Sequence, residues 1–253
     1  MNSSALPLVE VKGSPRQRGQ QQGEAARAQI LRAIDGYREL LPRASGLSWE
    51  ETQREALKFL PYAESAFPPF VEELRGIAEG SGASFQQAWT LNCFEGLTAV
   101  QAGRGCTSFA VRDDHVANGH VLLAHNEDWS RVDRDNVYLV RATPDDGPAY
   151  VGMTYGPLLV NIGLNDEGIG VAINSVYAND GRVGVPRIVF SRAVLGSRTI
   201  GQAILACVPK LRDGGYHYLL ADANGEIYSV ETSARVHDIT YGDVGWLAHT
   251  NHY

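Results

Sequence analysis

The sequence predicts an α+β protein, in which helices and strands occupy separate stretches of the chain rather than alternating. Apolar residues recur at helical spacing through much of the first hundred residues. After Gly105 the composition changes to short runs rich in β-branched and aromatic residues, separated by turn signals such as Asn118-Gly119. This change divides the chain into a helical segment, residues 1–105, and a strand-rich segment, residues 106–253.

Two capping boxes help to place the predicted helices. Ser48 with Glu51, and Ser84 with Gln87, each pair a serine at a helix start with a side chain that can bond back to it. Pro42 is expected to break the first helix. The predicted helices span residues 17–41, 48–61, 70–78, 84–97, 187–195 and 200–208. The predicted strands span residues 106–111, 120–124, 137–141, 158–162, 169–174, 216–221, 226–231, 236–240 and 245–248.

The composition is that of an ordinary globular enzyme and argues against several functions. The net charge of -7 and the pI near 5.5 disfavour a nucleic-acid partner, which requires a basic face. No apolar run approaches the roughly 18 residues of a membrane span and no signal-peptide pattern is present, so no membrane partner and a cytoplasmic location are expected. Three cysteines without a CxxC pair predict neither a disulfide framework nor a metal site. No nucleotide-binding glycine motif occurs, so no cofactor is expected.

Cys106 differs from Cys93 and Cys207, which are expected to be buried small apolar residues. It follows a glycine-rich loop and begins a predicted strand, so its thiol can attack the carbonyl carbon of Gly105 if the turn is strained. Gly105 has no side chain to hinder the attack. Hydrolysis of the resulting thioester would cut the chain between Gly105 and Cys106.

Such a cut would create a catalytic residue. The new α-amine of Cys106 would have a pKa of about 7.7–8.0, which suits a general base near neutral pH. The amine could activate the thiol of the same residue, directly or through a water. No catalytic histidine would then be required.

Five ordered segments resemble the acyl-coenzyme A:6-aminopenicillanic acid acyltransferase family, whose members are N-terminal-nucleophile (Ntn) hydrolases that mature by cleavage before a cysteine. The segments are residues 12–19 (KGSPRQRG, with Gly23 after it), 72–80 (EELRGIAEG), 105–109 (GCTSF), 125–129 (HNEDW) and 163–170 (GLNDEGIG, continuing to Asn174). The resemblance covers nearly the whole chain. It extends more distantly to bile-salt hydrolases and penicillin V acylases.

The resemblance implies an αββα four-layer sandwich with a helical pro-region, cut before Cys106 into two segments that remain associated. It implies that Asp128 is the acidic partner that orients the Cys106 amine or exchanges protons with it. Two strands joined at the Asn118-Gly119 turn would bring residue 128 back toward residue 106. The resemblance also places Asn251 as a side-chain donor, and Asn174 as a backbone donor, to the oxyanion hole. One such side-chain donor is worth about 3 kcal/mol.

His125, Asn126 and Trp129 are expected to line the substrate pocket. His125 stands where the bile-salt-hydrolase relatives have an arginine, three residues before the aspartate. An imidazole does not hold an anion as arginine does, so this position favours the acyltransferase branch over bile-salt or penicillin V substrates. A purely structural histidine is the alternative interpretation.

Family members continue beyond the position of Tyr253, so a chain truncated at its C-terminus is expected. The favoured function is an amide-bond enzyme that passes an acyl group from Cys106 to water or to an amine. Its substrate would be a small N-acyl amide or acyl-coenzyme A. Two alternatives stay open: a catalytically silent binding protein of the same fold, and a thiol protease in which a histidine is paired with Cys106.

Overall fold

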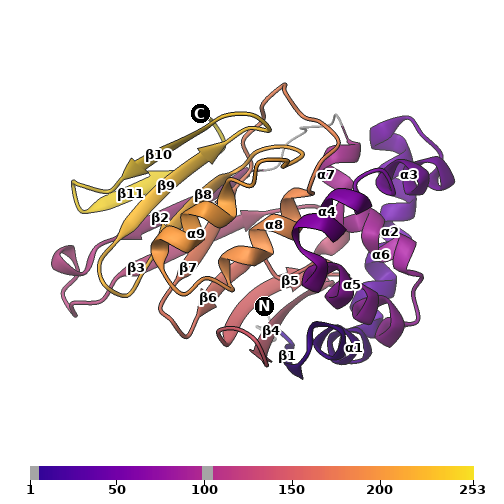
Figure 1. The fold of residues 1–253 in the computed structure, drawn as a ribbon, viewed down its shortest axis with the longest axis horizontal. Coiled ribbons are helices and arrows are strands. Elements are labelled where there is room, and N and C mark those ends of the chain that lie inside the picture. The colour runs from indigo at the N-terminus through magenta and orange to yellow at the C-terminus, as the bar shows by residue number, and fades with distance from the viewer. Residues whose placement is uncertain (1–5, 99–104) are drawn as a thin grey trace.

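The computed structural model describes residues 6–98 and 105–253, so most of the glycine-rich loop before Cys106 lies outside the described residues. The elements confirm the α+β class (Figure 1). The helices are α1 (Pro15–Ala25), α2 (Arg27–Ser45), α3 (Trp49–Ala56), α4 (Leu60–Ala66), α5 (Pro68–Ser81), α6 (Phe85–Asn92), α7 (Phe94–Leu97), α8 (Arg187–Val194) and α9 (Ile200–Cys207). The strands are β1 (Leu8–Gly13), β2 (Gly105–Val111), β3 (Leu122–Asp128), β4 (Val137–Pro144), β5 (Tyr150–Tyr155), β6 (Ile162–Asn165), β7 (Gly170–Asn174), β8 (His217–Ala221), β9 (Ile227–Thr232), β10 (His237–Tyr241) and β11 (Trp246–His249).

The strands form two sheets that pack face to face. One has the order β1-β4-β5-β6-β7-β8-β9-β10 and the other the order β11-β2-β3. A small apolar core fills the space between them, made of Ala110, Ala172, Leu219, Ala221 and Ile227. Helices α8 and α9 lie on the opposite face of the larger sheet, and helices α1 to α7 gather at one side of the molecule (Figure 1).

The described residues supply three of the four layers that the resemblance implies: helices, large sheet and small sheet. The outer face of the small sheet carries exposed apolar side chains, among them Phe109, Leu122 and Trp246. No helix of the described residues covers this face.

The N-terminal segment is not wholly helical, and the prediction for residues 1–105 is wrong at this point. Strand β1 pairs in parallel with β4, with Val9 opposite Val140. Val9 is buried while its sequence neighbours are exposed, which is the period-two pattern of a strand. Residues before and after Gly105 also share one hydrophobic core, so the two segments are not separate domains.

Further predictions differ from the structure. Residues 158–161 do not form a strand, because the side chain of Asn92 binds this part of the backbone: its Oδ1 accepts from the Leu159 N–H at 3.1 Å and its Nδ2 donates to the Pro157 carbonyl at 3.0 Å. Strand β6 begins only at Ile162. Strand β5 was not predicted. The first predicted helix is divided into α1 and α2, and α2 continues past Pro42 to Gly46, whose φ of 74° ends it. Both predicted capping boxes are confirmed.

The two N-terminal segments of the family resemblance form one tightly packed helix pair, α1 against α5. A Cβ on Gly19 would lie 2.0 Å from the carbonyl oxygen of Glu73, and one on Gly76 would lie 2.2 Å from that of Arg16. Gly23 and Gly80 make equally close approaches. The glycines therefore let the two backbones touch, which explains physically why both segments are glycine-rich.

Replacing Gly76 with alanine should consequently destabilise the fold. The added methyl group meets backbone rather than a flexible side chain, so we expect the free energy of unfolding to fall by about 1–3 kcal/mol. Gly201→Ala in α9 is the matched control, because a Cβ there meets nothing within 4 Å and alanine favours a helix. Denaturant unfolding of both variants measures the difference. Equal stabilities would contradict the close packing.

Candidate active site

The hairpin of β2 and β3 brings the cleavage site and its acidic neighbours together. In the register of this pair Gly105 lies opposite Asp128, and Cys106 lies opposite Glu127. The chain reverses through a loop in which the Gly119 N–H bonds to the Val116 carbonyl at 2.9 Å and Gly119 has a φ of 67°. Residue 128 thus returns to the start of the β2 strand, as the sequence predicts.

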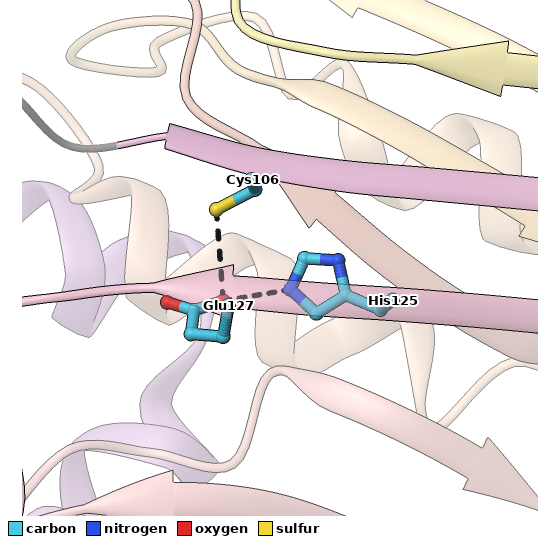
Figure 2. Close-up of side chains that lie close together, drawn as sticks. All are labelled: Cys106, His125 and Glu127. Carbon is cyan, nitrogen blue, oxygen red and sulfur yellow. Dashed lines mark hydrogen bonds and ion pairs between the residues drawn. The ribbon is translucent and has the colours of Figure 1, made fainter.

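The Cys106 side chain lies in a cluster with Glu127 and His125 (Figure 2). The Sγ donates to Glu127 Oε2 at 3.8 Å, and the same carboxylate oxygen lies 2.7 Å from His125 Nε2. His125 Nδ1 is 3.0 Å from Ser108 Oγ, which fixes the ring. All three side chains of the cluster are largely shielded from solvent. This is a thiol–carboxylate–imidazole arrangement in which the carboxylate stands between the other two groups.

Burial and, to a smaller extent, the charge of Glu127 raise the pKa of the Cys106 thiol to about 12. Hydrogen bonds from the backbone N–H groups of Asp128 and Ser175 act in the opposite direction. The thiol is consequently protonated at neutral pH. Any attack by this sulfur needs a group that takes its proton at the same time, and Glu127 is in place to do so.

The nitrogen of the scissile peptide bond is also held. The Cys106 N–H donates to Asn251 Oδ1 at 2.5 Å, while Asn251 Nδ2 donates to the Ser175 carbonyl at 2.8 Å. The Asn174 side chain is buried and is held by His217 Nδ1 at 3.0 Å and the His249 carbonyl at 3.3 Å. These bonds fix the turn after β7, and with it Ser175, beside the sulfur.

Asp128 lies opposite Gly105, and its side chain is on the face of the small sheet away from the Glu127 side chain. Its Oδ2 is 3.6 Å from the place that a Cβ on Gly105 would take, and its Oδ1 accepts from Asn126 Nδ2 at 3.0 Å. The side chains of Asn126 and Asp128 point to the exposed face of the small sheet. Strand alternation therefore turns Asn126, one of the expected pocket residues, away from Cys106.

Trp129 is also not a wall of the cavity beside the site. Its ring packs edge-on against Phe94 and tilted against Tyr155, and its Nε1 donates to Asp133 Oδ2 at 2.9 Å. The indole instead joins the end of β3 to the N-terminal helices. Of the three expected pocket residues, His125 alone lies beside Cys106.

Glu127 is the residue that sequence reasoning missed. The signal was present in principle, because a register that places residue 128 opposite 105 also places 127 opposite 106 and on the same face. That register depends on the length of the loop between the strands, which the Asn118-Gly119 turn alone does not fix.

The cluster also holds the donor atoms that zinc prefers. Cys106 Sγ, His125 Nε2 and Glu127 Oε2 lie within 4.8 Å of one another. We assign them to proton transfer instead, because hydrogen bonds already join the thiol to the carboxylate and the carboxylate to the imidazole.

A cavity of about 680 Å³ begins next to the site. Its wall includes Val176, which follows Ser175, and Tyr216, whose hydroxyl accepts from Ser175 Oγ at 3.0 Å. The remaining wall comes from residues between 47 and 59, α7, the loop from β7 to the start of α8, and the segment before β8. The cavity is therefore connected to the residue that contacts the sulfur.

The thiol on strand β2, the carboxylate beside it and the hydrogen-bonded Cys106 nitrogen fit the site expected of an Ntn-type enzyme. Residues 116–253, more than half of the chain, match the family model of acyl-coenzyme A:6-aminopenicillanic acid acyl-transferase. The chain belongs to this family.

The chain is also similar to individual known proteins. The acyl-coenzyme A:6-aminopenicillanic-acid-acyltransferase 40 kDa form of Emericella nidulans is 23% identical over 248 residues, which are 96% of this chain and 68% of the relative. Among solved structures, a variant of conjugated bile acid hydrolase from Clostridium perfringens has 16% identity and a TM-score of 0.41, over 58% of this chain and 53% of that one. Penicillin V acylase from Agrobacterium tumefaciens has 18% identity and a TM-score of 0.44, over 56% of this chain and 51% of the acylase chain. The chain spans about half the length of these two structures.

Across residues 6–98 and 105–253, every helix is too short or too polar to cross a membrane.

Proposed function

We propose that the protein is a self-processing Ntn hydrolase or acyltransferase that acts on the C–N amide bonds of small N-acyl compounds through an acyl-thioester on Cys106. One arrangement of Cys106 carries the proposal. Its sulfur donates a hydrogen bond to the Glu127 carboxylate, and its backbone N–H donates one to the side chain of Asn251. Membership of an acyltransferase family supports the reaction class.

Self-cleavage needs a base other than the amine, because the α-amine of Cys106 does not exist in the uncut chain. Glu127 takes the thiol proton as Sγ bonds to the Gly105 carbonyl carbon. The bond from that carbon to the Cys106 nitrogen then breaks, and the nitrogen gains a proton to become an amine. Water hydrolyses the thioester, leaving a carboxylate at Gly105 and a free thiol. His125 holds Glu127 in position through the 2.7 Å contact.

Turnover repeats this chemistry on a substrate. The amine of Cys106 takes over as general base and Asp128, next to Gly105, orients it. Sγ attacks the substrate carbonyl, the amine component leaves with a proton, and water or a second amine accepts the acyl group. Asn251 and Asn174 are the proposed oxyanion donors; Asn251 Nδ2 must then exchange its present bond to Ser175 for the oxyanion. Acyl-coenzyme A is an alternative acyl donor at the same sulfur.

The two segments are proposed to stay associated after the cut. Strand β1 pairs with β4, and Arg187 forms a largely buried ion pair with Glu95 at 2.8 and 2.5 Å. Each contact joins residues on opposite sides of Gly105. Burial of a shared core is the main force that would hold the segments together.

Glu127→Gln tests the role given to the carboxylate. The amide cannot accept the thiol proton, so we expect self-cleavage to slow by about 100-fold. The rate is followed by separating cut and uncut chains over time after synthesis. Glu231→Gln is the control, because Glu231 also pairs with a histidine, His249, at 2.8 Å but not at the sulfur. Equal rates of cleavage in Glu127→Gln and wild type would remove Glu127 from the mechanism.

The two alternative functions give different results. A silent binding protein would remain one uncut chain and release no amine from N-acyl amides. A thiol protease would require a histidine on the sulfur, whereas in the described residues Sγ bonds to Glu127 and His125 bonds to that carboxylate. The site favours the Ntn mechanism over a Cys–His pair.

A further inference from the structure

The cavity beside the active site contains a carboxyl group that the proposed reaction does not use. Asp213 lines the cavity and is 4% exposed, and its Oδ1 has no hydrogen-bond partner among the described residues. A Cβ on Gly96 would lie 3.1 Å from the Asp213 Oδ2, so the helix α7 backbone closes tightly over this carboxyl. A buried acid with an unused oxygen is costly unless it has a ligand.

The other charged groups of the cavity wall already have partners. Arg187 binds both oxygens of Glu95, and the Tyr216 hydroxyl donates to Glu95 Oε1 at 2.6 Å. Asp180 accepts from Ser233 Oγ at 2.7 Å and from backbone N–H groups. Arg182 donates to the carbonyls of residues 210, 212 and 234. Glu55 accepts from Lys58 Nζ at 2.6 Å. Among the carboxylates of the described wall, Asp213 is thus the one with a buried oxygen that has no hydrogen-bond partner.

A chain of contacts connects this part of the cavity to the nucleophile. The Ser175 N–H points at the Cys106 sulfur, the Ser175 hydroxyl binds Tyr216, and Tyr216 binds Glu95. Asp213 lies three residues before Tyr216 in the same wall. The wall that holds Asp213 is therefore linked by hydrogen bonds to the residue beside the sulfur.

We propose that the cavity binds the primary ammonium group of an amide substrate, with Asp213 as its counter-ion. The inference rests on the proposed amide-bond chemistry of Cys106 and names the class of substrate for it: an N-acyl compound that carries a primary amine near the scissile bond. An ammonium group supplies donors for the free Oδ1 and a positive charge beside the ionised Asp213 carboxylate.

The titration of Asp213 agrees with such a ligand. Burial, together with the charge of Glu95, raises the pKa of the Asp213 carboxyl to about 8, against the opposing effects of the Arg187 charge and of the backbone N–H groups of Gly214 and Arg187. The thiol of Cys93 also lies close to this carboxyl. An ammonium ligand favours the ionised carboxyl, so binding near pH 7 should release a proton.

The test compares substrates that differ only in charge. The pairs are β-alanyl-p-nitroanilide with butyryl-p-nitroanilide, and 6-aminohexanoyl-p-nitroanilide with heptanoyl-p-nitroanilide, in which an ammonium replaces a methyl group. In the pair whose acyl chain is long enough to bring the ammonium to Asp213, kcat/KM should be about 10- to 100-fold higher for the ammonium substrate than for the methyl one. Asp213→Asn should lose this preference. Asp222→Asn, a buried aspartate outside the cavity whose Oδ1 accepts from the backbone N–H groups of Asn224 and Glu226, should keep it.

A second measurement needs no turnover. n-Butylammonium chloride and 1-butanol are titrated into the purified wild type and into Asp213→Asn, with the heat followed in buffers of different ionisation enthalpy. We expect the ammonium to bind the wild type with proton release and to bind Asp213→Asn at least about tenfold more weakly. Equal affinity for ammonium and alcohol, or an unchanged ammonium affinity in Asp213→Asn, would overturn the inference. Ammonium binding without hydrolysis of any anilide would instead overturn the proposed function and leave the ammonium site standing.

Discussion

Cys106→Ala is expected to leave the protein as one uncut chain with no amide-bond turnover. The variant lacks the sulfur that attacks Gly105, and no second thiol is placed to replace it, since Cys93 and Cys207 are buried elsewhere. Denaturing gel electrophoresis and amine release from an N-acyl amide measure the two losses. The loss should be complete within detection, because both steps form a bond to the same atom.

Two variants control this result. Cys106→Ser keeps a nucleophile of similar size and should cut slowly, since a hydroxyl is a weaker nucleophile than a thiol. Cys207→Ala removes a sulfur whose hydrogen bond goes to the Ala203 carbonyl at 3.3 Å within α9, and it should cut normally. Cleavage of Cys106→Ala at the wild-type rate would show that another group breaks the bond.

Asn251→Ala should lower turnover by about 100- to 1000-fold through the loss of an oxyanion donor. The structure adds a second consequence. Asn251 Oδ1 holds the Cys106 nitrogen at 2.5 Å before the cut, so the variant should also slow maturation. Steady-state kinetics on fully matured protein measures the first effect, and the time course of cleavage measures the second.

Asn251→Asp separates the two roles of this side chain. The carboxylate keeps an oxygen that can accept from the Cys106 nitrogen, but it lacks the N–H donor. We therefore expect maturation to be retained better than in Asn251→Ala, while turnover falls as far in both variants. Full turnover in either variant would contradict the role of Asn251 as an oxyanion donor.

Local signals in the sequence were sufficient where the structure depends on neighbouring residues. The boxes at Ser48 and Ser84 start helices as predicted, and the strand that begins at the nucleophile was placed to within one residue. These features depend on hydrogen bonds and side-chain alternation within a few residues. The α+β class followed from them.

Long-range pairing set the features that the sequence did not reveal. Strand β1 is six residues long and is stabilised by β4, more than a hundred residues away. Residues 158–161 do not form the predicted strand, because the distant side chain of Asn92 binds the backbone of Pro157 and Leu159. The residues of a short apolar run do not indicate which distant residues will bind them, so these long-range contacts overrode the local propensity.

The candidate site divides in the same way. Cys106 and Asp128 could be singled out because a cleavage motif and a hairpin both point to them. Glu127 depended on a register that the loop sets, and Asp213 lies in a cavity built from four separate parts of the chain. Burial and an unused oxygen, which distinguish Asp213, become visible only when the fold is known.

N-terminal sequencing of the purified wild-type protein, together with its intact mass, tests the central claim most directly. Two chains are expected, the second of which starts Cys-Thr-Ser at residue 106. Protein that hydrolyses an amide while the bond between residues 105 and 106 is whole would contradict the account.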